Sequence, residues 1–139
     1  MVDARKFSFD EWKEQVPEVI RNERFWQWIA YPKALYLYDL LWQDTQEWMK
    51  DSRGKKLAAQ IIDSSDSICA NIEEGFGRGY GKQLVYFYTI SLGSARETKG
   101  WIYRAKALYN NPNIPQHRMA LAGEIIALLI TEINIQKNR

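Results

Sequence analysis

The chain has 139 residues, enough for one domain with a core that needs neither disulfides nor metal. Hydrophobic residues make up 46% and charged residues 26%, which excludes a disordered chain, and a net charge of +2 is too small to indicate nucleic acid by itself. The single Cys69 excludes an intrachain disulfide and fits a reducing compartment, so we expect a cytoplasmic protein. No signal peptide and no membrane-spanning segment are expected.

Residues 1–32 are expected to form a short helical extension. Ser8 and Glu11 have the spacing of a capping box, in which the hydroxyl accepts from a free amide of the first turn and the carboxylate reaches back to the cap. Pro17 limits this first helix. The segment that follows is rich in aromatic rings, including Trp26 and Trp28.

Residues 33–139 are expected to fold as an antiparallel up-down four-helix bundle. Apolar residues recur at helical spacing in four long segments, and Pro32 suits the first turn of the first one. The helices are expected at about residues 32–48, 55–74, 82–109 and 115–136. No segment shows the alternation of a strand, and short loops between long helices favour antiparallel neighbours.

The last helix is apolar over well over half of its circumference, from Met119 to Ile133. A helix that is apolar nearly all round must be covered nearly all round, whereas each helix of a four-helix monomer leaves one side open to water. Two arrangements satisfy this requirement, and both can hold. The helix is tucked under the N-terminal aromatic rings, or it forms a subunit interface.

A polar stripe follows the second long helix beside its isoleucines. Its members are Gln60, Asp63, Ser67, Asn71, Glu74 and Arg78. Asparagine and serine are poor helix-interior residues unless their side chains find partners, so we expect more than a solvated face. The stripe leads into a turn whose glycines let the chain reverse through positive φ. These glycines are Gly75, Gly77, Gly79 and Gly81.

Gly93 lies in the middle of the third long helix, at a cost of about 1 kcal/mol relative to alanine. With Ser94 and Ala95 it forms a patch of small side chains where we expect another helix to approach closely. Glu97 lies one turn further along, and we expect it to pair with a cation such as Arg78.

These residues resemble the signature of a family of four-helix-bundle proteins. The residues that carry the resemblance are Ser67, Ile68, Asn71, Ile72, Glu74, Gly75, Arg78, Gly93, Ser94 and Glu97. The family was first noticed as a reading frame in intervening sequences of bacterial large-subunit ribosomal RNA genes. It is also labelled ribosomal-protein-like, and it is similar to the accessory variability determinant of diversity-generating retroelements.

The resemblance covers roughly residues 34–136 and implies antiparallel four-helix protomers that assemble as a homopentamer. One departure concerns residues 62–66, which read Ile-Asp-Ser-Ser-Asp where the family usually carries a basic pair. This departure weakens the transfer of nucleic-acid binding from basic relatives to this chain.

The remaining chemical signals do not indicate catalysis. The glycine-rich run 75–82 lacks the spacing of a phosphate loop and follows a helix instead of a strand. His117 has no second histidine or cysteine partner for zinc, and Cys69 lies among isoleucines, as a buried inert thiol does. We therefore expect no enzyme, no metal and no cofactor. A hydrolase using Glu74 or Glu97 is kept only as a remote alternative.

Cations and aromatic rings alternate along the third helix, an arrangement that RNA-binding surfaces use. The candidate nucleic-acid contacts are Arg78, Lys82, Arg96, Lys99 and Arg104, and Lys106 follows them in the same run of cations. The interleaved rings are Tyr80, Tyr86, Tyr88, Trp101 and Tyr103. An amphipathic helix with core rings and solvated cations is the simpler interpretation for one protomer. Five copies around a ring would strengthen the case for binding, because multivalency raises affinity without new contacts.

The sequence therefore predicts a non-enzymatic oligomeric scaffold that acts as an RNA- or nucleoprotein-binding accessory factor. Its expected partners are further copies of itself and either RNA or a nucleic-acid-binding protein. The alternative is a protein–protein adaptor without nucleic-acid binding. Its partner docks either on the N-terminal aromatic side chains or on the central opening of the ring of five protomers.

Overall fold

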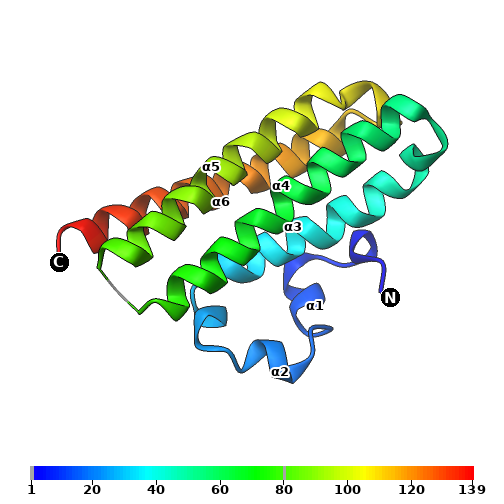
Figure 1. The fold of residues 1–139 in the computed structure, drawn as a ribbon. Coiled ribbons are helices and arrows are strands. Elements are labelled where there is room, and N and C mark those ends of the chain that lie inside the picture. Colours follow the sequence, from blue (N-terminus) through cyan, green and yellow to red (C-terminus); the bar gives the residue numbers. More distant parts are fainter. Residues whose placement is uncertain (1, 80) are drawn as a thin grey trace.

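Every regular element in the computed structural model is helical within residues 2–79 and 81–139, which are the residues it describes. Four long helices lie lengthwise beside one another (Figure 1). They are α3 (Ala30–Thr45), α4 (Ser52–Gly77), α5 (Lys82–Arg104) and α6 (Asn113–Lys137). The expected all-α fold is confirmed for this part of the chain.

The segment before α3 is a string of short helices that packs on α3 and, through η2, on α4. Its elements are η1 (Ala4–Lys6), α1 (Phe9–Lys13), α2 (Glu18–Arg21) and η2 (Arg24–Gln27). The expected capping box starts α1, since the Glu11 amide donates to Ser8 Oγ at 3.2 Å and the Ser8 amide to Glu11 Oε1 at 2.9 Å. Trp12 is only 4% exposed, so this segment contributes to the common core. The expected boundary between residues 32 and 33 falls inside α3.

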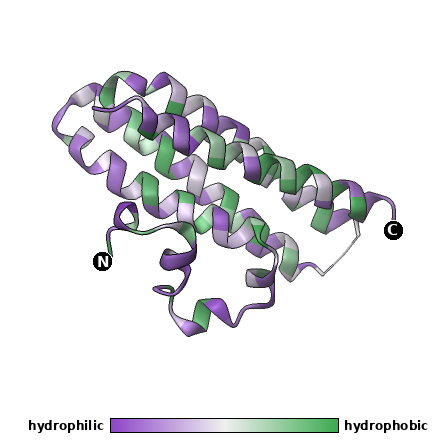
Figure 2. Ribbon diagram, turned by 180° about the vertical axis from the view of Figure 1, so that it is seen from behind, coloured by the Kyte–Doolittle hydropathy of each residue, from purple (hydrophilic) through white to green (hydrophobic). Residues whose placement is uncertain are grey.

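The core is built from one apolar side of each long helix. Its fully buried aliphatic side chains include Leu37, Leu40, Leu41, Ile61, Ile68, Ile72, Ile102, Ile125 and Leu129. Figure 2 shows hydrophobic and hydrophilic residues alternating along the long helices, as expected when one side of each helix is buried. Each buried aliphatic side chain stabilises the fold by about 1.5–3 kcal/mol relative to an exposed one.

Three ends of the long helices differ from the sequence prediction. α3 passes at Thr45 into the 3-10 helix η3 (Gln46–Lys50), and α5 ends at Arg104 and is followed by η4 (Lys106–Leu108). α4 begins earlier than expected because Asp51 caps it, accepting from the Arg53 amide at 2.7 Å. The N-cap hydrogen bond satisfies an amide that would otherwise lack a partner.

The turn between α4 and α5 uses fewer of its glycines than expected. Gly79 and Gly81 adopt φ of 86° and 81°, which favours glycine over residues with a side chain. Gly75 and Gly77 instead continue α4, so assigning them to the reversal was wrong.

The outward side of α6 is not covered by the N-terminal segment. Ile130 and Ile135 are 37% and 47% exposed, while Leu121, Ile125 and Leu129 are buried against α3 and α5. The prediction that the N-terminal rings enclose this helix is therefore wrong for its second half. Figure 2 shows how strongly hydrophobic that half is.

α6 is also long and apolar enough to cross a membrane by length and composition, which corrects the expectation that no segment is. The core helix of a helical bundle satisfies the same criterion. Since α6 supplies several buried side chains to the core, this property is weak support for a membrane location.

Candidate nucleic-acid interface

Polar residues of the family signature join α4 to α5. Ser67 Oγ and Ser94 Oγ lie 2.8 Å apart, and Asn71 Nδ2 donates to the backbone oxygen of Ser67 at 2.8 Å and to its Oγ at 3.0 Å. A turn away, Thr98 Oγ1 donates to Ser64 Oγ at 2.9 Å. Because residue numbers fall along α5 as they rise along α4, the two helices run antiparallel.

The apolar part of the signature fills the same seam. Ile68 and Ile72 are fully buried. Gly75 is buried against Tyr88, and a Cβ at this position would lie 2.8 Å from the tyrosine ring. The partners expected for the serines and the asparagine are therefore present, and their role is to hold two helices together.

Two expectations about the signature are corrected. Gly93 is exposed, and a Cβ there would meet nothing within 4 Å, so α4 approaches α5 closely at Gly75 and not at Gly93. Arg78 pairs with Glu74 at 2.8 Å instead of with Glu97. The antiparallel register explains the second result, because it places Glu97 near the level of Ser64, far from the end of α4 that carries Arg78.

The candidate nucleic-acid contacts of α5 fall into two separate groups. Arg78 and Lys82 lie at the turn before α5, whereas Arg96, Lys99 and Arg104 lie in its last turns. A rise of 1.5 Å per residue separates Lys82 from Arg104 by about 33 Å, so the five residues do not form one patch.

The interleaved rings are not equivalent either. Tyr88 is buried and Trp101 is half-buried, whereas Tyr86 and Tyr103 are 62% and 55% exposed. Tyr80 lies outside the described residues. Of the exposed rings, only Tyr103 lies near the cations of the last turns.

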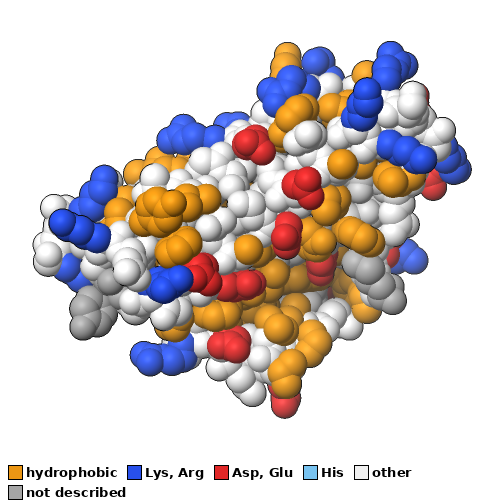
Figure 3. Space-filling model, in the orientation of Figure 1, with side chains coloured by type: hydrophobic (Ala, Val, Ile, Leu, Met, Phe, Trp, Pro, Cys, Tyr) orange, Lys and Arg blue, Asp and Glu red, His pale blue; other side chains and the backbone are white. Residues whose placement is uncertain are grey.

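Seven cations gather where α4 begins and α5 ends, a region that we call the basic end. They are Lys50, Arg53, Lys55, Lys56, Lys99, Arg104 and Lys106. Figure 3 shows Lys and Arg side chains collected over this end of the molecule. The antiparallel arrangement brings the first turn of α4 beside the last turn of α5, and Arg53 and Arg104 line one hollow of about 260 Å³.

Several cations of the basic end are free to bind an anion. Lys50 and Arg53 have carboxylates nearby, Glu47 at 3.1 Å and Asp51 at 3.9 Å, but these exposed pairs are worth little. Within residues 2–79 and 81–139, the other five cations of the basic end form no ion pair.

Rings accompany the cations at the end of α5. The guanidinium of Arg104 lies 4.3 Å from the centre of the Trp101 ring, and Lys106 Nζ lies 4.1 Å from that of Tyr103. These cation–π contacts orient the side chains without neutralising them. On the neighbouring side, Arg96, Lys99 and Tyr103 line a groove of about 610 Å³ between α5 and α6. Phosphates and unpaired bases are the groups that such cations and exposed rings bind.

The sequence analysis overlooked four of these cations, Lys50, Arg53, Lys55 and Lys56, because they lie on another helix. The four cations within residues 50–56 were the feature of the sequence that could have indicated a basic surface. Its importance depends on the antiparallel packing of α4 and α5.

Cys69 and His117 are the remaining titratable side chains that the sequence analysis singled out. Cys69 is buried as expected, and burial raises the pKa of its thiol. His117 lies in the first turns of α6, and its Nδ1 is 2.8 Å from Arg118 Nη1. No three His, Cys, Asp or Glu side chains among residues 2–79 and 81–139 are grouped to hold a metal ion.

The N-terminal aromatic side chains mostly pack on the bundle. They are the docking surface expected if the protein is a protein–protein adaptor. Trp12 is buried, and Trp26 and Trp28 are half-buried. Trp28 stacks on Tyr88 with ring centres 5.0 Å apart. These rings leave little surface for a partner.

Comparison with known families gives one match. The model of the family described as 23S rRNA-intervening sequence protein matches residues 27–131, most of the chain. The matched range begins ahead of the resemblance seen in the sequence and includes Trp28. Searches of curated proteins and of solved structures found no match.

Proposed function

The chain belongs to the 23S rRNA-intervening sequence protein family, and on this premise we propose that it is a non-enzymatic accessory scaffold that binds RNA through its basic end. The family name ties its members to ribosomal RNA genes, which is compatible with an RNA-related role. The resemblance recognised in the sequence is thereby confirmed at the level of the family.

The basic end is the observation that carries this proposal. A net charge of +2 is modest, but seven of the 19 lysine and arginine residues lie at this one end of the bundle, where Figure 3 shows Lys and Arg side chains collected. Phosphate contacts supply most of the sequence-independent affinity for nucleic acid, and this affinity depends on local charge. The exposed ring of Tyr103 beside Lys106 adds a surface for stacking an unpaired base.

We further propose that the four long helices form an up-down protomer of a homopentamer in the bacterial cytoplasm. Support for assembly comes from the exposed Ile130 and Ile135 of α6 and from Gly93 and Gly123, whose Cβ positions meet nothing within one protomer. Exposed isoleucines and open glycine positions on neighbouring helices are features of surfaces that another chain can cover. Repetition of the basic end around a ring would raise RNA affinity by multivalency.

The native mass of the purified protein, recorded with its absorbance ratio at 260 and 280 nm, tests both parts of this proposal. A multiple of the 16.4 kDa protomer with co-purifying nucleic acid is the expected result. After removal of that nucleic acid, the protein should bind structured RNA at low salt. Failure of the stripped protein to bind any structured RNA under these conditions would contradict the proposed function.

One observation favours a protein–protein adaptor as the second candidate. Trp42 and Met49, 39% and 50% exposed, line a hollow of about 300 Å³ between α3 and α4 with Ile62. The response to salt separates the two functions, because docking on an apolar surface lacks the steep loss of affinity that phosphate binding shows.

A further inference from the structure

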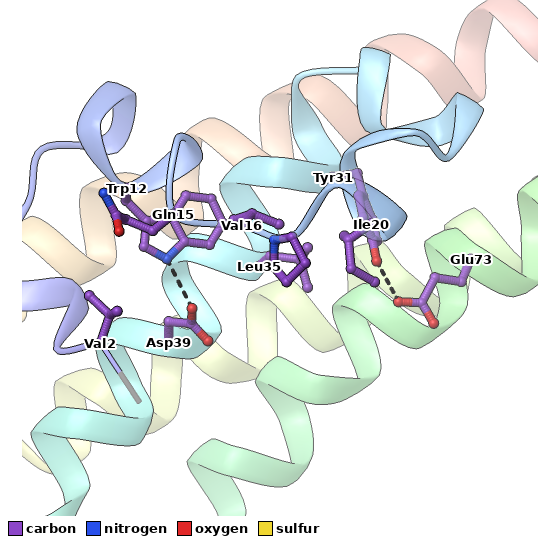
Figure 4. A pocket seen from close by; sticks show the side chains of 10 residues that line it. Val2, Trp12, Gln15, Val16, Ile20, Tyr31, Leu35, Asp39 and Glu73 are labelled. Atoms are coloured by element: carbon purple, nitrogen blue, oxygen red, sulfur yellow. Dashed lines mark hydrogen bonds between the residues drawn. The ribbon is translucent and has the colours of Figure 1, made fainter.

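A pocket of about 550 Å³ lies between the N-terminal segment and α3, with α4 at its edge. Figure 4 shows its side chains, and Figure 3 shows hydrophobic and acidic side chains together around the hollow on this face. Part of its wall comes from the segment that precedes the family match at residue 27. The pocket is therefore not made by the four long helices alone.

Each end of the pocket carries a carboxylate that is held by an aromatic donor. Trp12 Nε1 donates to Asp39 Oδ2 at 2.9 Å, and Tyr31 OH donates to Glu73 Oε2 at 2.7 Å (Figure 4). These hydrogen bonds fix both carboxylates in place. The second oxygen of each carboxylate accepts no hydrogen bond from the described residues, so both remain available to a ligand.

The two carboxylates are separated by an apolar trough. Tyr31, Leu35 and Asp39 are spaced four residues apart on α3, so they share one side of the helix and their Cα atoms span about 12 Å along it. Leu35 lies between the two polar ends, opposite Val16 and Ile20 of the N-terminal segment (Figure 4). An occupant that touches both carboxylates must therefore be long and must be apolar in its middle.

The pocket has negative charge without a compensating cation. No lysine or arginine lines it, and neither carboxylate enters an ion pair within residues 2–79 and 81–139. Arg21, which follows Ile20 in the N-terminal segment, is engaged with Glu14 and with the backbone oxygen of Val16. Burial raises the pKa of Asp39, which shows that its charged form is poorly solvated there. A cationic ligand would offset this cost.

We propose that this pocket binds a long linear aliphatic diamine, a chain of methylene groups with an ammonium group at each end. One terminal ammonium group contacts Asp39 beside the Trp12 ring, the other contacts Glu73 beside Tyr31, and the methylene chain lies along Leu35, Val16 and Ile20. Ammonium groups are attracted both to carboxylates and to the faces of aromatic rings. This site is distinct from the basic end, and the inference does not depend on RNA binding.

Calorimetric titration of the nucleic-acid-free full-length protein with 1,8-diaminooctane tests the inference. We expect one 1,8-diaminooctane per protomer, with a higher melting temperature in its presence. Asp39→Asn and Glu73→Gln should each weaken binding at least about tenfold, because each removes one charged contact while keeping the acceptor for its aromatic donor. A monoamine and the shorter 1,4-diaminobutane should bind more weakly than 1,8-diaminooctane, since neither is long enough to contact both ends of the pocket.

Glu74→Gln is the matched control, because it removes a neighbouring exposed carboxylate that does not line the pocket. This variant should bind 1,8-diaminooctane as the unmodified protein does. Equal weakening by all three variants would show that the amine only senses overall charge. No binding by the unmodified protein, or unchanged binding by folded Asp39→Asn and Glu73→Gln variants, would overturn the inference.

Discussion

Asp44 and Arg118 form a buried ion pair that joins α3 to α6. Arg118 donates from Nε to Asp44 Oδ2 at 2.7 Å and from Nη2 to Oδ1 at 3.0 Å, and their side chains are only 3% and 8% exposed. Tyr109 donates to the same carboxylate at 3.0 Å, and burial followed by the Asp44 charge raises the pKa of that phenol. The carboxylate thus ties two helices and the residue that follows η4 together.

Breaking this pair from one side should be strongly destabilising. Asp44→Ala leaves the guanidinium of Arg118 buried without its counter-charge, which typically costs about 3–5 kcal/mol. Urea unfolding followed by circular dichroism measures the loss. The double variant Asp44→Ala with Arg118→Met should lose less than the sum of the two single variants. Additive losses would mean that the two side chains do not interact in solution.

Gly75 and Gly93 should respond oppositely to alanine. At Gly75 the added Cβ would lie 2.8 Å from the buried ring of Tyr88, and overpacking of this kind costs about 1–3 kcal/mol. At Gly93 the Cβ meets nothing, so alanine should raise the free energy of unfolding by about 0.5–1 kcal/mol through helix propensity. Thermal unfolding of the two variants makes the comparison, and a stabilised Gly75→Ala would show that α4 and α5 are further apart here.

Asp39→Asn should make the protein more stable at neutral pH in amine-free buffer. Because burial raises the pKa of Asp39 in the fold above its usual 3.8, ionisation in the fold is costly, and stability is lost as the pH rises through the folded-state pKa. The advantage of the variant should shrink as the pH falls and vanish below 3.8, where both states bind the proton. Urea unfolding across this range checks the trend, and an advantage that does not change with pH would contradict it.

Charges on the outer side of α6 should disrupt assembly without unfolding the protomer. Ile130→Asp with Ile135→Asp places carboxylates at two exposed apolar positions, one on each flank of the buried side of α6. Light scattering after size exclusion should then report the 16.4 kDa protomer, where the unmodified protein gives five times that mass. Val19→Asp, at a residue that is 76% exposed on the N-terminal segment, should keep the assembly. A monomeric unmodified protein would exclude this interface.

The sequence predicted correctly those features that depend on a single helix. The spacing of apolar residues located the long helices, the capping box located α1, and the poor helix propensity of Ser67 and Asn71 indicated the partners that the structure supplies. It did not predict the contacts that depend on how two helices are aligned with each other. The register of α4 against α5 decides that Gly75 is packed and Gly93 is open, and that Arg78 reaches Glu74 and not Glu97.

The candidate sites depend on the same alignment. Lys56 and Lys106 are far apart in the chain. They lie at the same end of the bundle because α4 begins where the antiparallel α5 ends. The pocket between Asp39 and Glu73 likewise required the path of the N-terminal segment, which the helical pattern of the sequence does not specify.

The salt dependence of RNA affinity tests the central claim most directly. Two sets of variants are compared with the unmodified protein: Arg53→Gln, Lys56→Gln, Arg104→Gln and Lys106→Gln together at the basic end, and Arg78→Gln with Lys82→Gln at the opposite end of α5. If the basic end binds phosphates, the first set should weaken binding strongly and reduce the log–log slope by roughly 0.7–0.9 for each lost contact. The second set should leave affinity and slope nearly unchanged. Equal slopes for the unmodified protein and the basic-end variant, at unchanged helicity and mass, would contradict the account.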